Sequence, residues 1–159
     1  RYSSSIFPVR KRRYGLPDAL RFPHRWAGGQ LIEFPLLTLR AAGRNWPAGG
    51  GGYTRLLPAP IMAHAIRRMN HEGHPAAIYL HPYELAPGEV SDFMRAGTRV
   101  SAARRFTQEL WRSRVEPRLS RLMGEFAFGP MGESLACCRL DWKGLDAAAP
   151  PRAAISAAC

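Results

Sequence analysis

The stretch PIMAHAIRRMNHEGHPAAIYLHPYE, residues 60–84, decides the fold. Apolar residues in its first half recur at positions i, i+3, i+4 and i+7, which form one face of a helix: Met62, Ala65, Ile66 and Met69. Proline suits the first turn of a helix and glycine suits its end, and the segment has Pro60 and Gly73 at those places. The sequence therefore predicts a helix over residues 60–72.

A short apolar run, AAIYL at 76–80, follows that helix after a tight turn and predicts a buried strand. A helix, a tight turn and a buried strand form the αβ half of a βαβ unit, so the fold class is α/β. His81 follows the carboxyl end of the expected strand. In parallel α/β barrels, that end of the strands carries the chemistry.

The residues before this unit are rich in proline and glycine. Residues 1–25 predict a short strand followed by an ordered loop, because their prolines and Gly15 exclude a long helix. Gly28-Gly29 predicts a turn. The run QLIEFPLLTL, 30–39, is strand-like with an edge or bend at Pro35, and residues 41–53 read as a loop.

The residues after this unit favour helices. We expect a loop over 85–100 and a helical pattern over 101–124, kinked or divided at Pro117. Residues 125–135 could hold a short edge strand. The alanine- and proline-rich stretch 136–159 has weak patterning and predicts a disordered tail.

Composition and charge narrow the classes of protein. The hydrophobic fraction of 46% is ordinary for a globular core. No apolar stretch is long enough for a transmembrane helix. The net charge of +11 is compatible with a nucleic-acid-binding protein, but no nucleic-acid motif is present, so a solvated surface is the preferred interpretation. The cysteines, 137, 138 and 159, form no CxxC pair, which favours reduced thiols over a zinc knuckle.

Two further patterns are weak signals. His64, His71, His74 and His81 lie close in sequence, but HEGH at 71–74 is not HExxH. Surface or capping histidines are therefore a better interpretation than a zinc site. The four glycines at 49–52 lack the lysine of a phosphate-binding loop, and instead predict a tight loop that allows close backbone approach.

The motif HPYE at 81–84 is more informative. The proline after His81 restricts the histidine backbone. An imidazole titrates near neutral pH and can pass a proton to a leaving group. Glu84 is placed either to orient the ring or to cap a turn. From these residues alone, a structural histidine and a catalytic one both remain open.

Four blocks of sequence, in order, resemble the NodB-type polysaccharide deacetylases of exopolysaccharide gene clusters that have exosortase systems. These blocks are YSSSIFP at 2–8 with RYGLPDALRFP at 13–23, LIEFPLLTLR at 31–40, PAGGGGYTRLLP at 47–58 and AAIYLHPYEL at 76–85. The region 85–135 resembles the helical extension that follows the barrel in that branch. The resemblance implies that 1–84 is the C-terminal portion of a distorted (β/α) deacetylase barrel, that 85–135 is its helical extension, and that 136–159 is the tail.

The resemblance also implies an activity, the removal of acetyl groups from the amino sugars of a bacterial exopolysaccharide. A divalent metal, zinc in most members, activates water, an Asp acts as base, and a His acts as acid toward the departing amine. The metal-binding and base motifs belong to blocks that precede YSSS, so no metal ligand is assigned within this chain and its partner would be the N-terminal half of the barrel. The alignment makes His81 the general acid.

The other residues that the resemblance implicates surround that histidine. The expected substrate-binding residues are aromatic: Tyr79, Tyr83, Trp46 and Tyr53. The site-supporting residues are Ser3, Glu33 and Glu84. Ser3 stands where the family has Asp, and Tyr79 where the general pattern has Leu. A degenerate, non-catalytic glycan-binding member is therefore the alternative. We expect a cytoplasmic location, with the periplasm or cell envelope as the alternative.

Overall fold

The computed structural model describes residues 1–11, 14–26 and 31–137. Its central element is helix α2 (Ala59–His71), which confirms the helix expected over 60–72. The four periodic apolar residues are all buried on one face of α2. Gly73 has a positive φ of 85°, a conformation that glycine adopts without steric cost, and the helix ends just before it.

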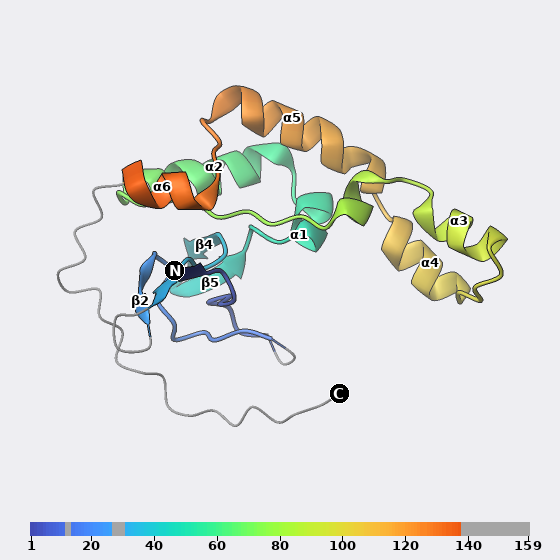
Figure 1. The fold of residues 1–159 in the computed structure, drawn as a ribbon, viewed down its shortest axis with the longest axis horizontal. Coiled ribbons are helices and arrows are strands. Elements are labelled where there is room, and N and C mark those ends of the chain that lie inside the picture. The colour runs from blue at the N-terminus through green and yellow to red at the C-terminus, as the bar shows by residue number, and fades with distance from the viewer. Residues whose placement is uncertain (12–13, 27–30, 138–159) are drawn as a thin grey trace.

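The main core lies where α2 meets the hairpin strands and helix α5 (Val115–Glu125), which runs beside α2 in Figure 1. Leu37 and Leu122 are fully buried against the apolar face of α2. Together they cover the apolar face that periodicity predicted. The apolar face of α2 therefore packs against residues from both the N-terminal and the C-terminal parts of the described chain.

The strands form two small sheets, and no closed barrel is present within the described residues. The first sheet has the order β1-β3-β2, with β1 (Tyr2–Ser3) parallel to β3 (Leu31–Glu33) and β2 (His24–Trp26) antiparallel to β3. The second sheet is the hairpin of β4 (Thr38–Ala41) and β5 (Arg44–Pro47). The strand expected over 30–39 is thus divided at Pro35, where a bend was predicted. The architecture is mixed α/β.

The expectation of a loop over 41–53 is wrong. Residues 44–47 are strand β5, and helix α1 (Gly51–Leu56) follows. The hairpin turns at Ala42 and Gly43, which both have positive φ, 49° and 71°. That two-residue turn normally carries Asn-Gly, and alanine at its first position hides the signal.

The segment 76–80 was expected to be a buried strand, and it is extended but makes only a single β-bridge. Ala77 bridges Leu36 in a parallel sense, and the Leu37 amide donates to the Ala77 carbonyl oxygen at 2.9 Å. The Tyr79 amide donates to the Gly49 carbonyl oxygen, also at 2.9 Å. The segment therefore lies between two other stretches of backbone, but its pairing is too short for a strand.

The loop expected over 85–100 is also wrong in part, because it contains helix α3 (Glu89–Arg95). Helix α4 (Ala102–Glu109) packs against α3, and Figure 1 shows this pair extending away from the rest of the molecule. The short helices η1 (Pro82–Leu85) and η2 (Arg112–Arg114) precede α3 and α5 respectively.

The helical pattern over 101–124 is divided into two helices as expected, but not at Pro117. The break lies at Trp111, which has a positive φ of 57°, whereas Pro117 falls in the first turn of α5, where proline is tolerated. The edge strand considered for 125–135 is wrong, because helix α6 (Met131–Cys137) occupies the end of that stretch. The disordered tail expected over 136–159 is wrong for residues 136–137, which belong to α6. The rest of that tail, 138–159, with Cys138 and Cys159, and the Gly28-Gly29 turn lie outside the described residues.

Within the described residues, no helix combines the length and the hydrophobicity needed to cross a bilayer.

His74 makes the stability of this fold depend on pH. Its ring stacks on Phe22, with centroids 4.1 Å apart, and burial lowers the pKa of His74 despite the opposing charge of Glu72. The unfolded chain therefore takes up this proton at a higher pH than the folded chain. Between the folded pKa and the ordinary value of about 6.5, the free energy of unfolding must rise with pH.

We therefore expect urea denaturation to give a lower free energy of unfolding at about pH 5.5 than at about pH 7.5. His74→Phe keeps a ring on Phe22 and removes the titrating group, so it should reduce that difference. His64→Gln, which changes an exposed histidine of α2, is the control. An equal reduction in both variants would contradict the assignment to His74.

Candidate functional site

His81 has a fixed backbone and an exposed side chain. It lies at the end of the 76–80 segment, in an extended conformation (φ −88°, ψ 145°) that also suits a residue before proline. Its amide donates to Glu84 Oε2 at 3.0 Å, and the Glu84 amide donates to the His81 carbonyl oxygen at 2.9 Å. Of the two roles considered for Glu84, capping the turn is therefore the one observed.

Glu84 is 1% exposed and lies directly against the glycine run. A Cβ atom placed on Gly51 would lie 1.5 Å from Glu84 Oε2, and one on Gly49 would lie 2.7 Å from the Ala77 carbonyl oxygen. Only residues without a side chain fit at these two positions. Gly49 and Gly51 thus allow the close approach that the sequence predicted for the glycine run, and what approaches them is Glu84 of HPYE and the segment before HPYE.

The His81 ring is held between two tyrosines. Tyr79 meets it edge to face, with centroids 5.1 Å apart and planes at 88°, and Tyr83 stacks on it at 5.0 Å and 11°. The guanidinium of Arg112 lies over the ring of Tyr83, 5.1 Å from its centroid. Arg112 is itself buried and donates to the Ala86 carbonyl oxygen at 3.3 Å. The structure therefore brings three of the expected site residues together.

Two more tyrosines extend this group beyond Gly50. A Cβ atom on Gly50 would lie 3.3 Å from Tyr79 Cε1 and 3.4 Å from Tyr53 Cδ2, so both rings cover the same glycine. The Tyr53 hydroxyl is 3.0 Å from the Tyr14 hydroxyl. We call Tyr14, Tyr53, Tyr79, His81 and Tyr83 the aromatic row.

Two phenols of the row, those of Tyr53 and Tyr79, have a raised pKa. Burial, and then the hydrogen bond with Tyr14, raises the pKa of Tyr53 far above its ordinary value. Burial and the nearby Glu84 carboxylate raise the pKa of Tyr79. Both hydroxyls therefore remain neutral hydrogen-bond donors at physiological pH, which suits contact with a polyhydroxylated ligand.

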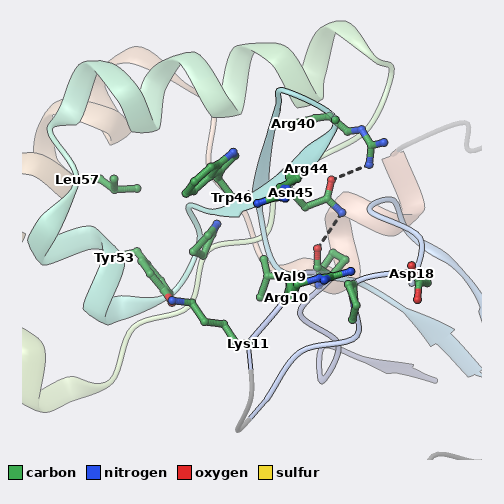
Figure 2. Close-up of a pocket in the computed structure, with 14 residues that line it drawn as sticks. Val9, Arg10, Lys11, Asp18, Arg40, Arg44, Asn45, Trp46, Tyr53 and Leu57 are labelled. Atoms are coloured by element: carbon green, nitrogen blue, oxygen red, sulfur yellow. Dashed lines mark hydrogen bonds between the residues drawn. The ribbon is translucent and has the colours of Figure 1, made fainter.

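Trp46 shares a pocket with Tyr53, and His81 is not among the residues that line this pocket. Trp46 is on β5, is 54% exposed, and its indole N–H donates to the Ala41 carbonyl oxygen at 3.3 Å. Both rings line a cavity of about 720 Å³, drawn in Figure 2, between the hairpin, α1 and the N-terminal loop. Tyr53 thus belongs both to the aromatic row and to this pocket.

The expected supporting residues Ser3 and Glu33 organise the N-terminal loop. Glu33 is buried, and its Oε1 accepts the amides of Ser5 and Ile6, each at 2.7 Å. Ser3 Oγ is 2.7 Å from Ser5 Oγ, and Ser4 Oγ donates to the Phe34 carbonyl oxygen at 2.7 Å. These hydrogen bonds hold the loop on β3 and do not run to His81.

Comparison with known proteins identifies a family. The model of the domain family of unknown function DUF3473 matches residues 4–136. The chain belongs to the DUF3473 family. This family is associated with polysaccharide deacetylase-like proteins. No curated protein and no solved structure matches the chain.

The match of this DUF3473 chain covers the aromatic row and the helices that follow it alike. Sequence reasoning missed two residues that support the row. Tyr14 reaches Tyr53 from a proline-rich loop, and Arg112 reaches Tyr83 from a short helix much later in the chain. Neither position follows a periodic pattern, so no local signal could have found them.

The described part of this DUF3473 chain does not fit a metal centre. Within it, no group of three or more His, Cys, Asp or Glu side chains is placed to hold a metal ion. His64 and His71 are exposed on α2, His74 stacks on Phe22, and His81 lies in the aromatic row.

Proposed function

We propose that this DUF3473 chain is part of a metal-dependent polysaccharide N-deacetylase and contributes its general acid, His81, together with part of its glycan-binding surface. The observation that carries the proposal is the position of His81. Its backbone is fixed by Glu84, while its ring is exposed between Tyr79 and Tyr83. The family's association with polysaccharide deacetylase-like proteins supports the same activity.

The finer fold assignment is part of this proposal. Residues 1–84 would complete a distorted (β/α) barrel with strands that precede this chain, and 85–135 would form its helical extension. Two parallel pairings support the barrel, β1 with β3 and Leu36 with Ala77, because parallel pairing is the rule in such barrels. The zinc or other divalent ion, and the base, would be held by the preceding part.

The reaction would be the hydrolysis of an amide to acetate and a free amine. Water adds to the acetyl carbonyl, and the C–N bond then breaks. An amide anion is too poor a leaving group to depart alone, so the nitrogen must gain a proton as that bond breaks. The exposed imidazolium of His81 would deliver this proton, and the neutral imidazole would regain one from the water consumed.

The neighbouring rings would hold the sugar and the imidazole in place. Aromatic faces pack against the apolar faces of sugar rings, and the neutral hydroxyls of Tyr53 and Tyr79 donate hydrogen bonds to sugar oxygens. Tyr83 stacks on one face of His81 and so limits rotation of its ring. Arg112, whose guanidinium lies over the Tyr83 ring, would help to hold that ring in place.

The test is acetate release by the protein as its gene encodes it. An oligomer of N-acetylglucosamine serves as the substrate, and both acetate and new amine groups are measured. We expect the two products in equal amounts. Binding of the oligomer without release of either product, in the presence of zinc, would overturn the deacetylase proposal.

Binding of the oligomer without release of acetate or amine would favour the alternative, a glycan-binding protein of the same fold. The aromatic row and the exposed face of Trp46 support this candidate independently of catalysis. Ser3 stands where the deacetylases that this chain resembles carry Asp, and this supports the glycan-binding alternative as well. Acetate release above that of a control without protein would exclude the glycan-binding alternative.

A further inference from the structure

The pocket beside the aromatic row is strongly basic. Four cationic side chains line it, with Asp18 as its one carboxylate: Arg10, Lys11, Arg40 and Arg44. Within the described residues, none of the four forms an ion pair with a carboxylate. We call this pocket, with Asn45, Trp46 and Tyr53, the basic groove.

Some arginines elsewhere in the described chain form ion pairs with carboxylates. Arg21 and Arg68 both contact the carboxylate of Glu72, at 3.2 and 3.0 Å, and Arg105 contacts Glu109 at 3.1 Å. The basic groove gathers four cations around the carboxylate of Asp18, so it carries a local excess of positive charge. A concave surface lined by one sign of charge concentrates ligands of the opposite sign.

The walls of the basic groove are tied together, as Figure 2 shows. Asn45 Nδ2 donates to the Pro8 carbonyl oxygen at 2.8 Å, which links the hairpin to the N-terminal loop. Arg40 Nη1 donates to Asn45 Oδ1 at 3.1 Å, so the same side chain also positions one of the cations. The cavity of about 720 Å³ falls in the size range of small-ligand pockets.

The groove also offers aromatic surface. Trp46 is 54% exposed, and Tyr53 also lines the groove, from α1. Cations bind carboxylates, and aromatic faces pack on sugar rings, so the combination matches a sugar that carries a carboxylate. Tyr53 is also part of the aromatic row, which makes the groove continuous with the surface around His81.

We propose that the basic groove binds an acidic, uronate-type sugar unit of the polysaccharide whose acetylated unit lies at His81. This inference rests on the proposed function, because it requires that an acetylated sugar reacts at His81 in the aromatic row beside the groove. It specifies the substrate class: a polymer in which acidic units accompany N-acetylated ones.

The test measures the binding of two oligosaccharides by calorimetry. A hexamer of galacturonic acid represents the acidic polymer, and a hexamer of N-acetylglucosamine represents a neutral one. The Arg40→Gln/Arg44→Gln double variant of the protein as its gene encodes it should bind the acidic hexamer at least tenfold more weakly and the neutral hexamer as before. Arg99→Gln/Arg121→Gln is the control, since it removes the same charge from exposed positions outside the groove.

Three results would overturn the inference. The first is no measurable binding of the acidic hexamer by the unaltered protein. The second is an equal loss in the control variant, which would assign the effect to net charge. The third is binding of a single-stranded DNA hexamer with the same affinity and the same dependence on Arg40 and Arg44, which would make the groove a general polyanion site.

Failure of this inference is separable from failure of the proposed function. Acetate release from the neutral hexamer by the unaltered protein tests only the deacetylase. Binding of the acidic hexamer tests only the groove, and it should be unchanged in His81→Gln. A protein that releases acetate but ignores the acidic hexamer keeps the first proposal and loses the second.

Discussion

His81→Gln should lower the kcat for acetate release by about 10²–10⁴-fold, the usual contribution of a general acid. Gln keeps the size and polarity of the side chain and removes the transferable proton. The backbone hydrogen bonds with Glu84 involve main-chain atoms of residue 81, so the turn should be retained. The KM for the oligomer should change little, because the surrounding tyrosines remain.

A substrate that needs no general acid separates catalysis from structural damage. p-Nitrophenyl acetate releases a stable phenolate, so its hydrolysis should be nearly the same in His81→Gln and in the unaltered protein. His64→Gln, at an exposed position of α2, is the control for the amide substrate. If His81→Gln hydrolysed the amide at the normal rate, or lost both activities together, His81 would not be the proton donor.

The parts of this fold that local pattern determines were predicted correctly from the sequence. Helix α2 follows from four apolar residues on one face and from Pro60 and Gly73 at its ends. The bend at Pro35 follows from the missing amide of proline. In each case, the energetic cause lies within a few residues of the feature that it produces.

The errors arose where the cause is not visible in the local sequence. The hairpin was missed because Ala42 occupies a position of positive φ that usually carries Asn or Gly. The break between α4 and α5 lies at Trp111, another residue with no turn signature. The sequence of 76–80 is typical of a strand, but the segment forms only a single β-bridge, between Leu36 and Ala77, and not a continuous ladder of hydrogen bonds.

In the candidate site, too, residues that are close in sequence were predicted and residues that meet only through the tertiary fold were not. The segment YLHPYE, 79–84, placed Tyr79, His81 and Tyr83 together because they are close in sequence. In the structure Tyr79 meets the imidazole edge to face and Tyr83 stacks on it. Tyr14 and Arg112 join them only through the tertiary fold. The basic groove likewise collects cations from a loop and a hairpin, and the net charge alone gave no indication that they gather there.

Gly51→Ala should lower the free energy of unfolding by about 3–5 kcal/mol, which combines overpacking with the loss of a hydrogen bond to a buried charge. The new Cβ would lie 1.5 Å from Glu84 Oε2, so the buried carboxylate must move. Glu84 would then leave the His81 amide that it now accepts. Urea denaturation of the protein as its gene encodes it measures the loss, and the amide resonance of His81 should shift.

Gly52→Ala is the matched control. Gly52 lies in the same helix, and a Cβ atom there would lie 3.9 Å from the flexible end of the Arg55 side chain. Because alanine favours a helix over glycine by roughly 0.5–1 kcal/mol, Gly52→Ala should be neutral or stabilising. Adding Glu84→Ala to Gly51→Ala removes the clash, so the double variant should lose less stability than the two single changes added together. A Gly51→Ala protein as stable as Gly52→Ala would show that the carboxylate of Glu84 does not occupy this position. The glycine run would then have no part in fixing His81.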